Sequence, residues 1–219
     1  MKAKYCIFDM DGVLIDSEPM YRKFLFEVFQ LSDIQLSEEY IENLTGMSEK
    51  PMWEKVKADS GSEKTAEELA NFYRNYIQER LPQAEVLEVE GVKNVIKLLK
   101  ENGFSLSIAS SSARKWIEFF TKKIGIYEYF DVISSGDDVK YSKPFPEIFL
   151  KVAQWYKISS ENFWVIEDSK NGVQAAKSAG MNCIGFQSIN SGNQDLAKAD
   201  VIIHSMDEIT QDFINEKMQ

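Results

Sequence analysis

The stretch KYCIFDMDG, residues 4–12, decides the fold that the sequence predicts. Four apolar strand formers lead into two aspartates, Asp9 and Asp11, and Gly12 lets the backbone turn away. Side chains two residues apart on a strand point to the same face, so we expect both carboxylates at one side of the strand's carboxyl end. In an open parallel sheet, ligands bind at that edge.

Two carboxylates at this spacing have two interpretations. As a site, they repel each other, so one keeps a proton unless a divalent cation neutralises the pair. One aspartate can then serve as a nucleophile while the other exchanges protons. As a turn, Asp11 and Gly12 lie at the surface and Asp9 caps a helix. These nine residues alone do not decide between the two interpretations.

Composition narrows the possible partners. The 219 residues include 25 basic and 35 acidic side chains, which gives a net charge of −10. Such a balance disfavours nucleic acid and anionic membranes as partners, so an anionic substrate needs a local positive pocket. Cys6 and Cys183 lie in separate apolar runs, which indicates two buried thiols in a reducing compartment. With no membrane-length apolar stretch and no signal peptide, we expect a cytoplasmic protein.

The pattern of apolar residues divides the chain into two parts. Helical spacing dominates the first part, with helices expected at residues 18–29, 37–46, 48–58 and 65–80. Strands separated by helices follow, with strands expected at residues 104–109, 132–134, 163–166, 183–186 and 201–203.

This order predicts an α/β fold with a doubly wound parallel, Rossmann-like sheet. The helical block interrupts the sheet directly after the first strand, as an inserted α-helical cap domain. We expect a core of residues 1–16 and 83–219 and a cap of residues 17–82. Such an insertion is expected to cover the carboxyl edge of the sheet as a lid.

Two further strands end in polar residues that a parallel sheet brings to the same edge. Ser110 offers a hydroxyl beside the free amides of a starting helix, which suits a phosphate oxygen. Glu167 and Asp168 are hard oxygen ligands suited to magnesium. Between these strands, Lys143 lies on a loop stiffened by two prolines.

Each of these residues also has a purely structural interpretation. Ser111, Ser112 and Ser169 fit helix N-caps, Asp168 can complement a helix dipole, and Lys143 can be a solvated surface lysine. Taken together, however, two carboxylates, a hydroxyl, a lysine and an acidic pair predict a metal-assisted phosphoryl-transfer site.

Four segments resemble, in order, the four motifs of the haloacid dehalogenase superfamily: DMDGVLIDSE, the strand ending in IASSS, SKPFPEIF and VIEDSKNGVQAAKSAGM. The resemblance covers essentially the whole chain. The helical insert is similar to the cap of the branch that contains β-phosphoglucomutase and phosphoglycolate phosphatase. The combination of DxDG with KPxP and ED is specific, and it implies a phosphatase-like enzyme that uses magnesium. The dehalogenases proper lack the second aspartate, so Asp11 favours phosphate chemistry.

The resemblance implies a role for each motif residue. Asp9 would attack phosphorus and form an aspartyl phosphate, while Asp11 would protonate the leaving group and then activate water. Ser110 and Lys143 would bind the transferring phosphoryl oxygens. The amide of Ser111 would be an additional donor to the substrate.

The same resemblance implies a ligand set for Mg²⁺. Asp9, the backbone carbonyl of Asp11 and Asp168 would hold the ion. Glu167 would be either a further ligand or the holder of a metal-bound water.

The cap departs from the mutase pattern at two positions. Tyr21 stands where β-phosphoglucomutases carry a histidine, and Glu49 stands where they carry an arginine that grips a second phosphate. Both are candidate substrate contacts, as is Arg114 after the serine cluster, and each can equally serve packing.

The predicted function is a magnesium-dependent phosphatase of a small phosphorylated metabolite, a sugar phosphate or similar phosphomonoester. The alternatives are a phosphosugar mutase of the β-phosphoglucomutase type and a non-catalytic, sugar-phosphate-binding regulator. We expect a monomer or homodimer that binds neither nucleic acid nor membrane. The sequence leaves the substrate unidentified.

Overall fold

The computed structural model describes residues 4–44, 47, 49–188, 190–192 and 194–218. The chain divides into two compact units. One unit is built from Met1–Asp16 and Val86–Gln219, and the other from Ser17–Glu85. The first is an α/β unit and the second is helical.

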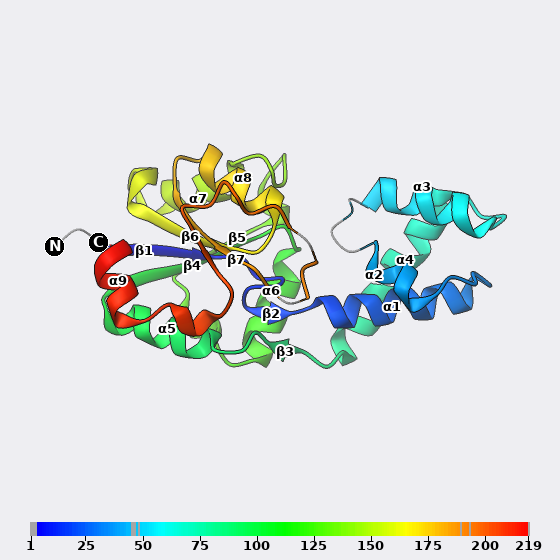
Figure 1. Ribbon diagram of the computed structural model, residues 1–219, viewed down its shortest axis with the longest axis horizontal. Coiled ribbons are helices and arrows are strands. Elements are labelled where there is room, and N and C mark those ends of the chain that lie inside the picture. The colour runs from blue at the N-terminus through cyan, green and yellow to red at the C-terminus, as the bar shows by residue number, and fades with distance from the viewer. Residues whose placement is uncertain (1–3, 45–46, 48, 189, 193, 219) are drawn as a thin grey trace. The chain divides into compact units, whose positions relative to one another are not determined.

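The α/β unit contains a parallel sheet in the order β5-β4-β1-β6-β7-β8 (Figure 1). Its strands are β1 (Lys4–Phe8), β4 (Phe104–Ser110), β5 (Val132–Ser135), β6 (Phe163–Glu167), β7 (Asn182–Phe186) and β8 (Val201–Ile203). The first strand is therefore central, with β4 and β6 as its neighbours, and β8 lies at an edge. The predicted doubly wound α/β fold is confirmed.

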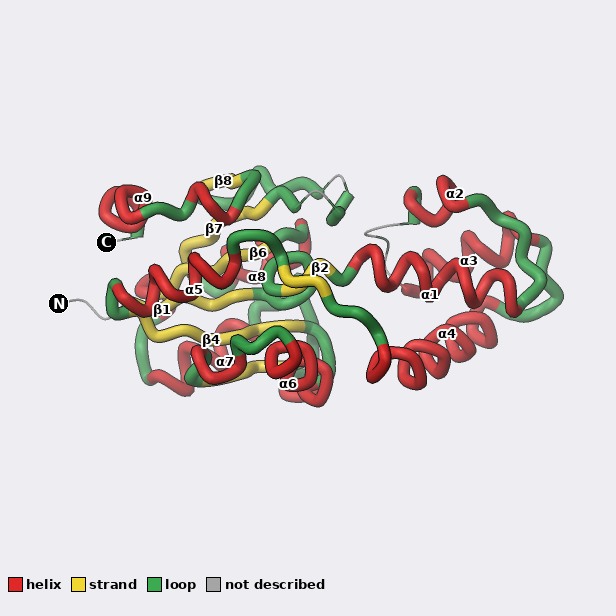
Figure 2. Tube along the Cα trace, turned by 90° about the horizontal axis from the view of Figure 1, so that it is seen from below, coloured by secondary structure: helices red, strands yellow, loops and turns green. Residues whose placement is uncertain are grey.

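Helices cover both faces of this sheet (Figures 1 and 2). They are α5 (Val92–Glu101), α6 (Arg114–Lys123), α7 (Glu147–Tyr156), α8 (Lys170–Ser178) and α9 (Gln211–Lys217). Figure 1 shows α7 and α8 on one side of the sheet and α5 and α9 on the other. Because both faces are covered, a central strand can be apolar at every position, and Cys6, Ile7 and Phe8 are all fully buried.

The helical unit contains α1 (Glu18–Leu31), α2 (Glu38–Glu42), α3 (Glu49–Ser60) and α4 (Ala66–Arg80). Its core includes Trp53, whose ring centroid lies 6.4 Å from that of Phe29 and 5.5 Å from that of Tyr73. Trp53 is 1% exposed, so it packs the interior of this unit. A capping box begins α4, since Thr65 and Glu68 satisfy each other's backbone amides.

Two local features differ from the sequence prediction. The helix expected at 37–46 is described only over Glu38–Glu42, and its predicted end at Gly46, like the predicted start of the next helix at Ser48, lies outside the described residues. The structure also adds an antiparallel pair, β2 (Ile15–Asp16) with β3 (Leu87–Glu88). Strands of two residues carry no hydrophobic periodicity, so the sequence pattern could not indicate them.

The predicted buried thiols are confirmed, because Cys6 and Cys183 are both buried and free.

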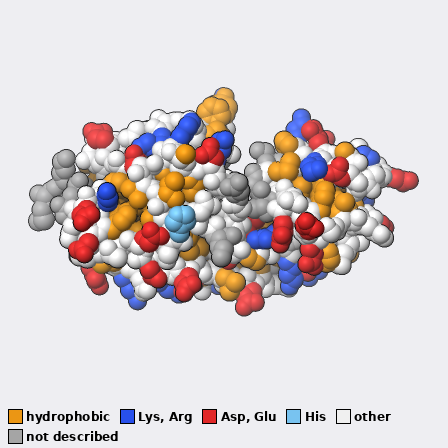
Figure 3. Space-filling view, in the orientation of Figure 1, with side chains coloured by type: hydrophobic (Ala, Val, Ile, Leu, Met, Phe, Trp, Pro, Cys, Tyr) orange, Lys and Arg blue, Asp and Glu red, His pale blue; other side chains and the backbone are white. Residues whose placement is uncertain are grey.

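On the face shown in Figure 3, acidic and basic side chains are interspersed over the surface. Within the described part of the chain, every helix is too short or too polar to span a bilayer.

Asp200 ties β7 to the segment before β8. Its carboxylate accepts hydrogen bonds from the backbone N–H of Cys183 at 2.7 Å and from Lys177 Nζ at 2.6 Å. Burial acts to raise the pKa of Asp200, but these two donors outweigh it and hold the pKa below its usual value.

We therefore expect Asp200→Ala to lower the thermal midpoint at pH 7. A depressed carboxyl pKa contributes stability above the unfolded pKa, which is about 4, and this contribution is lost as pH falls through the folded pKa. The difference from wild type should shrink between pH 5 and pH 2 in thermal melts. Asp195→Ala is the control, because it removes an exposed ion pair with Lys170 and one 3.3 Å hydrogen bond from the N–H of Ala197. A difference that persists unchanged at pH 2 would contradict this account.

Candidate active site

Strand β1 places Asp9 at the centre of the carboxyl edge of the sheet. Phe8 lies in register with Ile108 of β4 and with Ile166 of β6, and the N–H of Asp9 donates to the carbonyl of Ile166 at 3.0 Å. The residues that follow these three strands therefore emerge side by side. This parallel register explains why distant sequence motifs meet.

Lys143 reaches this edge from the loop after β5. Its Nζ lies 2.6 Å from Asp9 Oδ1 and 2.5 Å from Glu167 Oε1, and it donates to the carbonyl of Ala109 at 3.1 Å. The lysine side chain is only 7% exposed. The structural alternative of a solvated surface lysine is therefore wrong.

Glu167, the last residue of β6, is fully buried and fixed at both carboxylate oxygens. Oε1 faces Lys143, and Oε2 accepts from the N–H of Ser169 at 3.1 Å and from its hydroxyl at 3.0 Å. Ser169 also caps α8 by accepting from the N–H of Gly172 at 3.0 Å. The N-cap interpretation of Ser169 is therefore confirmed, and the same serine also holds the Glu167 carboxylate.

The first turn of α8 makes room for that carboxylate. A Cβ added to Gly172 would lie 1.8 Å from the carboxyl carbon of Glu167. Gly12, with φ +76°, leaves room for Asp168 in the same way, because a Cβ there would lie 1.9 Å from Asp168 Oδ2. That same Oδ2 accepts a hydrogen bond from the hydroxyl of Ser191.

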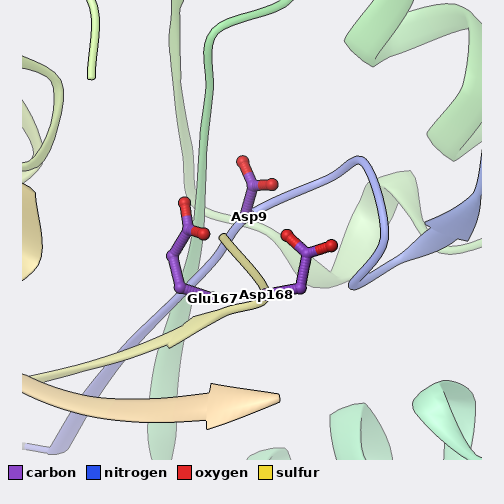
Figure 4. A group of neighbouring side chains, drawn as sticks. All are labelled: Asp9, Glu167 and Asp168. Carbon is purple, nitrogen blue, oxygen red and sulfur yellow. The ribbon is translucent and has the colours of Figure 1, made fainter. Parts of the chain in front are cut away.

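Asp9, Glu167 and Asp168 form a buried acidic cluster in which one oxygen from each residue lies within 4.8 Å of the others. Figure 4 shows the carboxylates directed toward a common space, Asp9 from the end of β1 and the other two from the end of β6. We call these three residues the acidic cluster.

Burial dominates the electrostatics of the cluster. It raises the pKa of the Asp9 carboxyl to about 7, against the opposing effect of the Lys143 ammonium. Burial also raises the pKa of Asp168 well above its usual range, with the Glu167 charge adding to the effect. For Lys143, burial acts to lower the pKa, but the charges of Asp9 and Glu167 outweigh it and raise the pKa above the usual lysine value.

These properties fit a divalent cation. Three carboxylates share one ammonium in a poorly solvated space, and the raised pKa values of Asp9 and Asp168 indicate that full ionisation of the cluster needs a further positive charge. Hard oxygen donors of this kind are the ligands that Mg²⁺ prefers. The carboxylate of Asp11 is not part of the acidic cluster. The backbone carbonyl of Asp11 as a metal ligand stays a prediction.

The segment after β4 contacts Asp11. The hydroxyl of Ser112 donates to Asp11 Oδ2 at 2.9 Å, and the N–H of Ser112 donates to the hydroxyl of Ser110 at 3.1 Å. Ser111 instead exchanges a hydrogen bond with Ser142 at 2.8 Å, next to Lys143. The helix that follows is capped at Ala113 without a side-chain hydrogen bond, so the N-cap alternative for Ser111 and Ser112 is wrong.

The remaining predicted substrate contacts have other partners. Arg114 donates to Asp138 Oδ2 at 2.7 Å and to the carbonyl of Ile133 at 2.9 Å. It lines a cavity of about 320 Å³ beside β5, whose lining contains no residue of the acidic cluster.

In the helical unit, Glu49 is paired with Arg74. The backbone carbonyl of Tyr21 accepts from the hydroxyl of Tyr73 at 3.4 Å. The roles of Tyr21, Glu49 and Arg114 in substrate binding stay predictions.

Sequence reasoning gave three residues of this region no role at the site. Gly172 lies inside the motif that follows Glu167, and its glycine identity within a helix was an available signal. Ser112 was assigned only a capping alternative. Ser191 lies in the segment between β7 and β8 with no neighbouring motif, so nothing in the sequence connected it to Asp168.

Comparison with known proteins gives a consistent result. The family model for haloacid dehalogenase-like hydrolases matches residues 6–186. A phosphorylated carbohydrates phosphatase from Thermotoga maritima is 33% identical over 211 residues, which covers 93% of this chain and 94% of that protein.

Two solved structures share the architecture over nearly the full length. CbbY from Rhodobacter sphaeroides, a mutant in complex with xylulose-(1,5)bisphosphate, has a TM-score of 0.74 at 25% identity and covers 94% of this chain and 96% of its own. β-Phosphoglucomutase from Clostridium difficile has a TM-score of 0.71 at 25% identity, covering 99% of this chain and 97% of its own.

Fold, site and relatives together define a phosphohydrolase. The chain belongs to the haloacid dehalogenase-like hydrolase family.

The packing of Glu167 against α8 gives a prediction with an unusual sign. Gly→Ala in a helix normally stabilises by up to about 1 kcal/mol, but at Gly172 the added methyl would overlap the Glu167 carboxylate. We expect Gly172→Ala to lower the thermal midpoint by scanning calorimetry. Ser178→Ala, at the exposed end of the same helix, is the control and should leave the midpoint near wild type. A Gly172→Ala protein as stable as wild type would show that Glu167 can relocate freely.

Proposed function

We propose that this protein is a magnesium-dependent phosphatase that hydrolyses a small phosphorylated carbohydrate through an aspartyl phosphate at Asp9. The observation that carries this proposal is the buried Asp9 carboxylate held by Lys143 beside Glu167 and Asp168. A nucleophile, a fixed cation and a cation-binding acidic pair are the components that phosphoryl transfer requires.

Asp9 would attack phosphorus through the carboxylate oxygen that is not hydrogen-bonded to Lys143. The lysine ammonium fixes the rotation of Asp9 and adds positive potential where phosphoryl oxygens gather. Ser110, buried at the end of β4, would donate its hydroxyl to one of those oxygens. Asp11 would give a proton to the departing sugar oxygen and then take one from the attacking water.

Asp9, Asp168 and Glu167 would hold Mg²⁺, with Glu167 bound directly or through water. When bound, the ion offsets the repulsion between these carboxylates and a phosphate dianion.

The relatives support the substrate class. A protein with one third of its residues identical to this chain acts, by its name, on phosphorylated carbohydrates. The cap, residues 17–82 in the sequence prediction, would select among them. A non-catalytic regulator is disfavoured because Asp9, Asp11, Ser110, Lys143 and Asp168 are all present at one edge of the sheet.

A phosphosugar mutase is the second candidate, favoured by the likeness to β-phosphoglucomutase. At the position where β-phosphoglucomutases carry an arginine, the carboxylate of Glu49 would repel a second phosphate. Because Glu49 is paired with Arg74, that repulsion is reduced, and an arginine does lie next to this position. Hydrolysis is then supported by Tyr21, which stands where β-phosphoglucomutases carry a histidine, and by the relative that is named a phosphatase.

Product analysis distinguishes the two candidates. We expect the protein, incubated with Mg²⁺ and a panel of hexose and pentose phosphates, to release inorganic phosphate. With β-glucose 1-phosphate and a trace of the 1,6-bisphosphate, inorganic phosphate should form faster than glucose 6-phosphate. Asp9→Asn should release none, with a thermal midpoint near wild type because Lys143 keeps its ion pair with Glu167. Faster accumulation of glucose 6-phosphate would establish the mutase instead.

Removal of the metal gives a second test. Exhaustive dialysis against a chelator should abolish phosphate release, and added Mg²⁺ should restore it. In calorimetric titrations without substrate, Asp168→Ala should bind Mg²⁺ at least tenfold more weakly than wild type, whereas Asp195→Ala should bind it normally. Full activity after chelation, or unchanged Mg²⁺ affinity in Asp168→Ala, would refute the metal assignment.

A further inference from the structure

Ser112 connects the acid–base candidate Asp11 to the end of the sheet. Its hydroxyl donates to Asp11 Oδ2 at 2.9 Å. Its N–H donates to the hydroxyl of Ser110 at 3.1 Å, and its carbonyl accepts from the N–H of Gly136 at 3.0 Å. All three polar groups of this residue are therefore engaged, and its side chain is held toward Asp11.

The position of this turn depends on a close backbone approach. A Cβ at Gly136 would lie 2.2 Å from the carbonyl oxygen of Ser111, so a side chain there would push the serine turn away. Gly136 directly follows β5, the neighbour of β4. The turn is thereby fixed to two adjacent strands rather than to a mobile loop.

The Ser112 hydroxyl has no part in starting the next helix. That helix begins at Arg114 and its N-cap is Ala113, while the N–H of Arg114 donates to Asp137 Oδ2 at 2.8 Å. Removing the hydroxyl would therefore cost one hydrogen bond to Asp11 without removing a helix cap.

We propose that Ser112 is a positioning residue for Asp11; this inference rests on the proposed phosphatase function. A hydroxyl that donates to Oδ2 fixes the rotation of the Asp11 carboxyl group and therefore the direction of its other oxygen, Oδ1. Ser112 orients the acid toward the leaving group and does not itself touch the reacting atoms.

The proton balance shows where this orientation matters. In the first half-reaction, a bond forms between an Asp9 oxygen and phosphorus, the ester P–O bond breaks, and the Asp11 proton moves to the departing oxygen. In the second, water attacks phosphorus, its proton moves to Asp11, and the Asp9 carboxylate is released. Ser112 gains and loses no proton in either half-reaction.

The need for a well-placed acid depends on the leaving group. A sugar alkoxide is a strong base and must be protonated as the bond breaks, whereas p-nitrophenolate is stable without a proton. Loss of Asp11 positioning should therefore slow hydrolysis of the sugar or alkyl ester far more than hydrolysis of the nitrophenyl ester. A general loss of folding or of phosphate binding would slow both equally.

The test measures kcat/KM, which reports formation of the aspartyl phosphate, for an alkyl phosphate and for p-nitrophenyl phosphate. For Ser112→Ala we expect a loss of roughly tenfold to a hundredfold with the alkyl ester and less than about threefold with the nitrophenyl ester. Ser112→Thr, which keeps the hydroxyl, should restore most of the loss. Ser134→Ala is the matched control, because Ser134 is a buried serine on β5 whose hydroxyl has no partner among the described residues.

Thermal midpoints of all variants establish that they are folded. Equal losses with both esters, no loss at all, or failure of Ser112→Thr to restore activity would each overturn the positioning role while leaving the phosphatase intact. Absence of phosphate release by the wild-type protein from either ester would contradict the proposed function, and this inference with it.

Discussion

The ion pair between Lys143 and the two carboxylates of Asp9 and Glu167 is the constraint on which the site depends. Removing the ammonium and the two carboxylates from water costs several kcal/mol per ion, and only close hydrogen bonds between them offset this cost. The backbone N–H and the hydroxyl of Ser169, which both donate to Glu167 Oε2, add to this stabilisation. What remains is Asp168, whose pKa is raised by burial and by the Glu167 charge, and a bound cation is what would favour its ionised form.

Space for this charge is provided by the absence of side chains. Gly172 lies against Glu167 and Gly12 against Asp168, and a methyl group at either position would overlap a carboxylate. Gly136 likewise leaves room for the backbone carbonyl of Ser111 in the turn after β4. Backbone therefore forms much of the wall around the site, which limits how far the buried acids can move.

Much of this could be predicted from the sequence. Apolar runs before Asp9, Ser110 and Glu167 predicted three strands, and parallel pairing brings their ends to one edge whatever the detailed packing. Partners supplied from loops could not be predicted in this way. Ser191 and the direction of Arg114, which turns to Asp138, depend on loop conformations that leave no periodic signal. The hydroxyl of Ser112 fits a cap in sequence, and only the position of Ala113 at the helix start shows otherwise.

The short pair β2–β3 has a consequence for how such enzymes diversify. Ile15 pairs with Glu88 and Asp16 with Leu87, so the chain leaves the α/β unit and returns to it at points about 5 Å apart. For the sheet, the whole helical unit is then equivalent to the loop of a hairpin. The entropy of closing a loop grows only slowly with its length, so segments of very different size can be exchanged at this point at little cost to the folding of the core. A two-residue ribbon thus makes the helical unit a replaceable module.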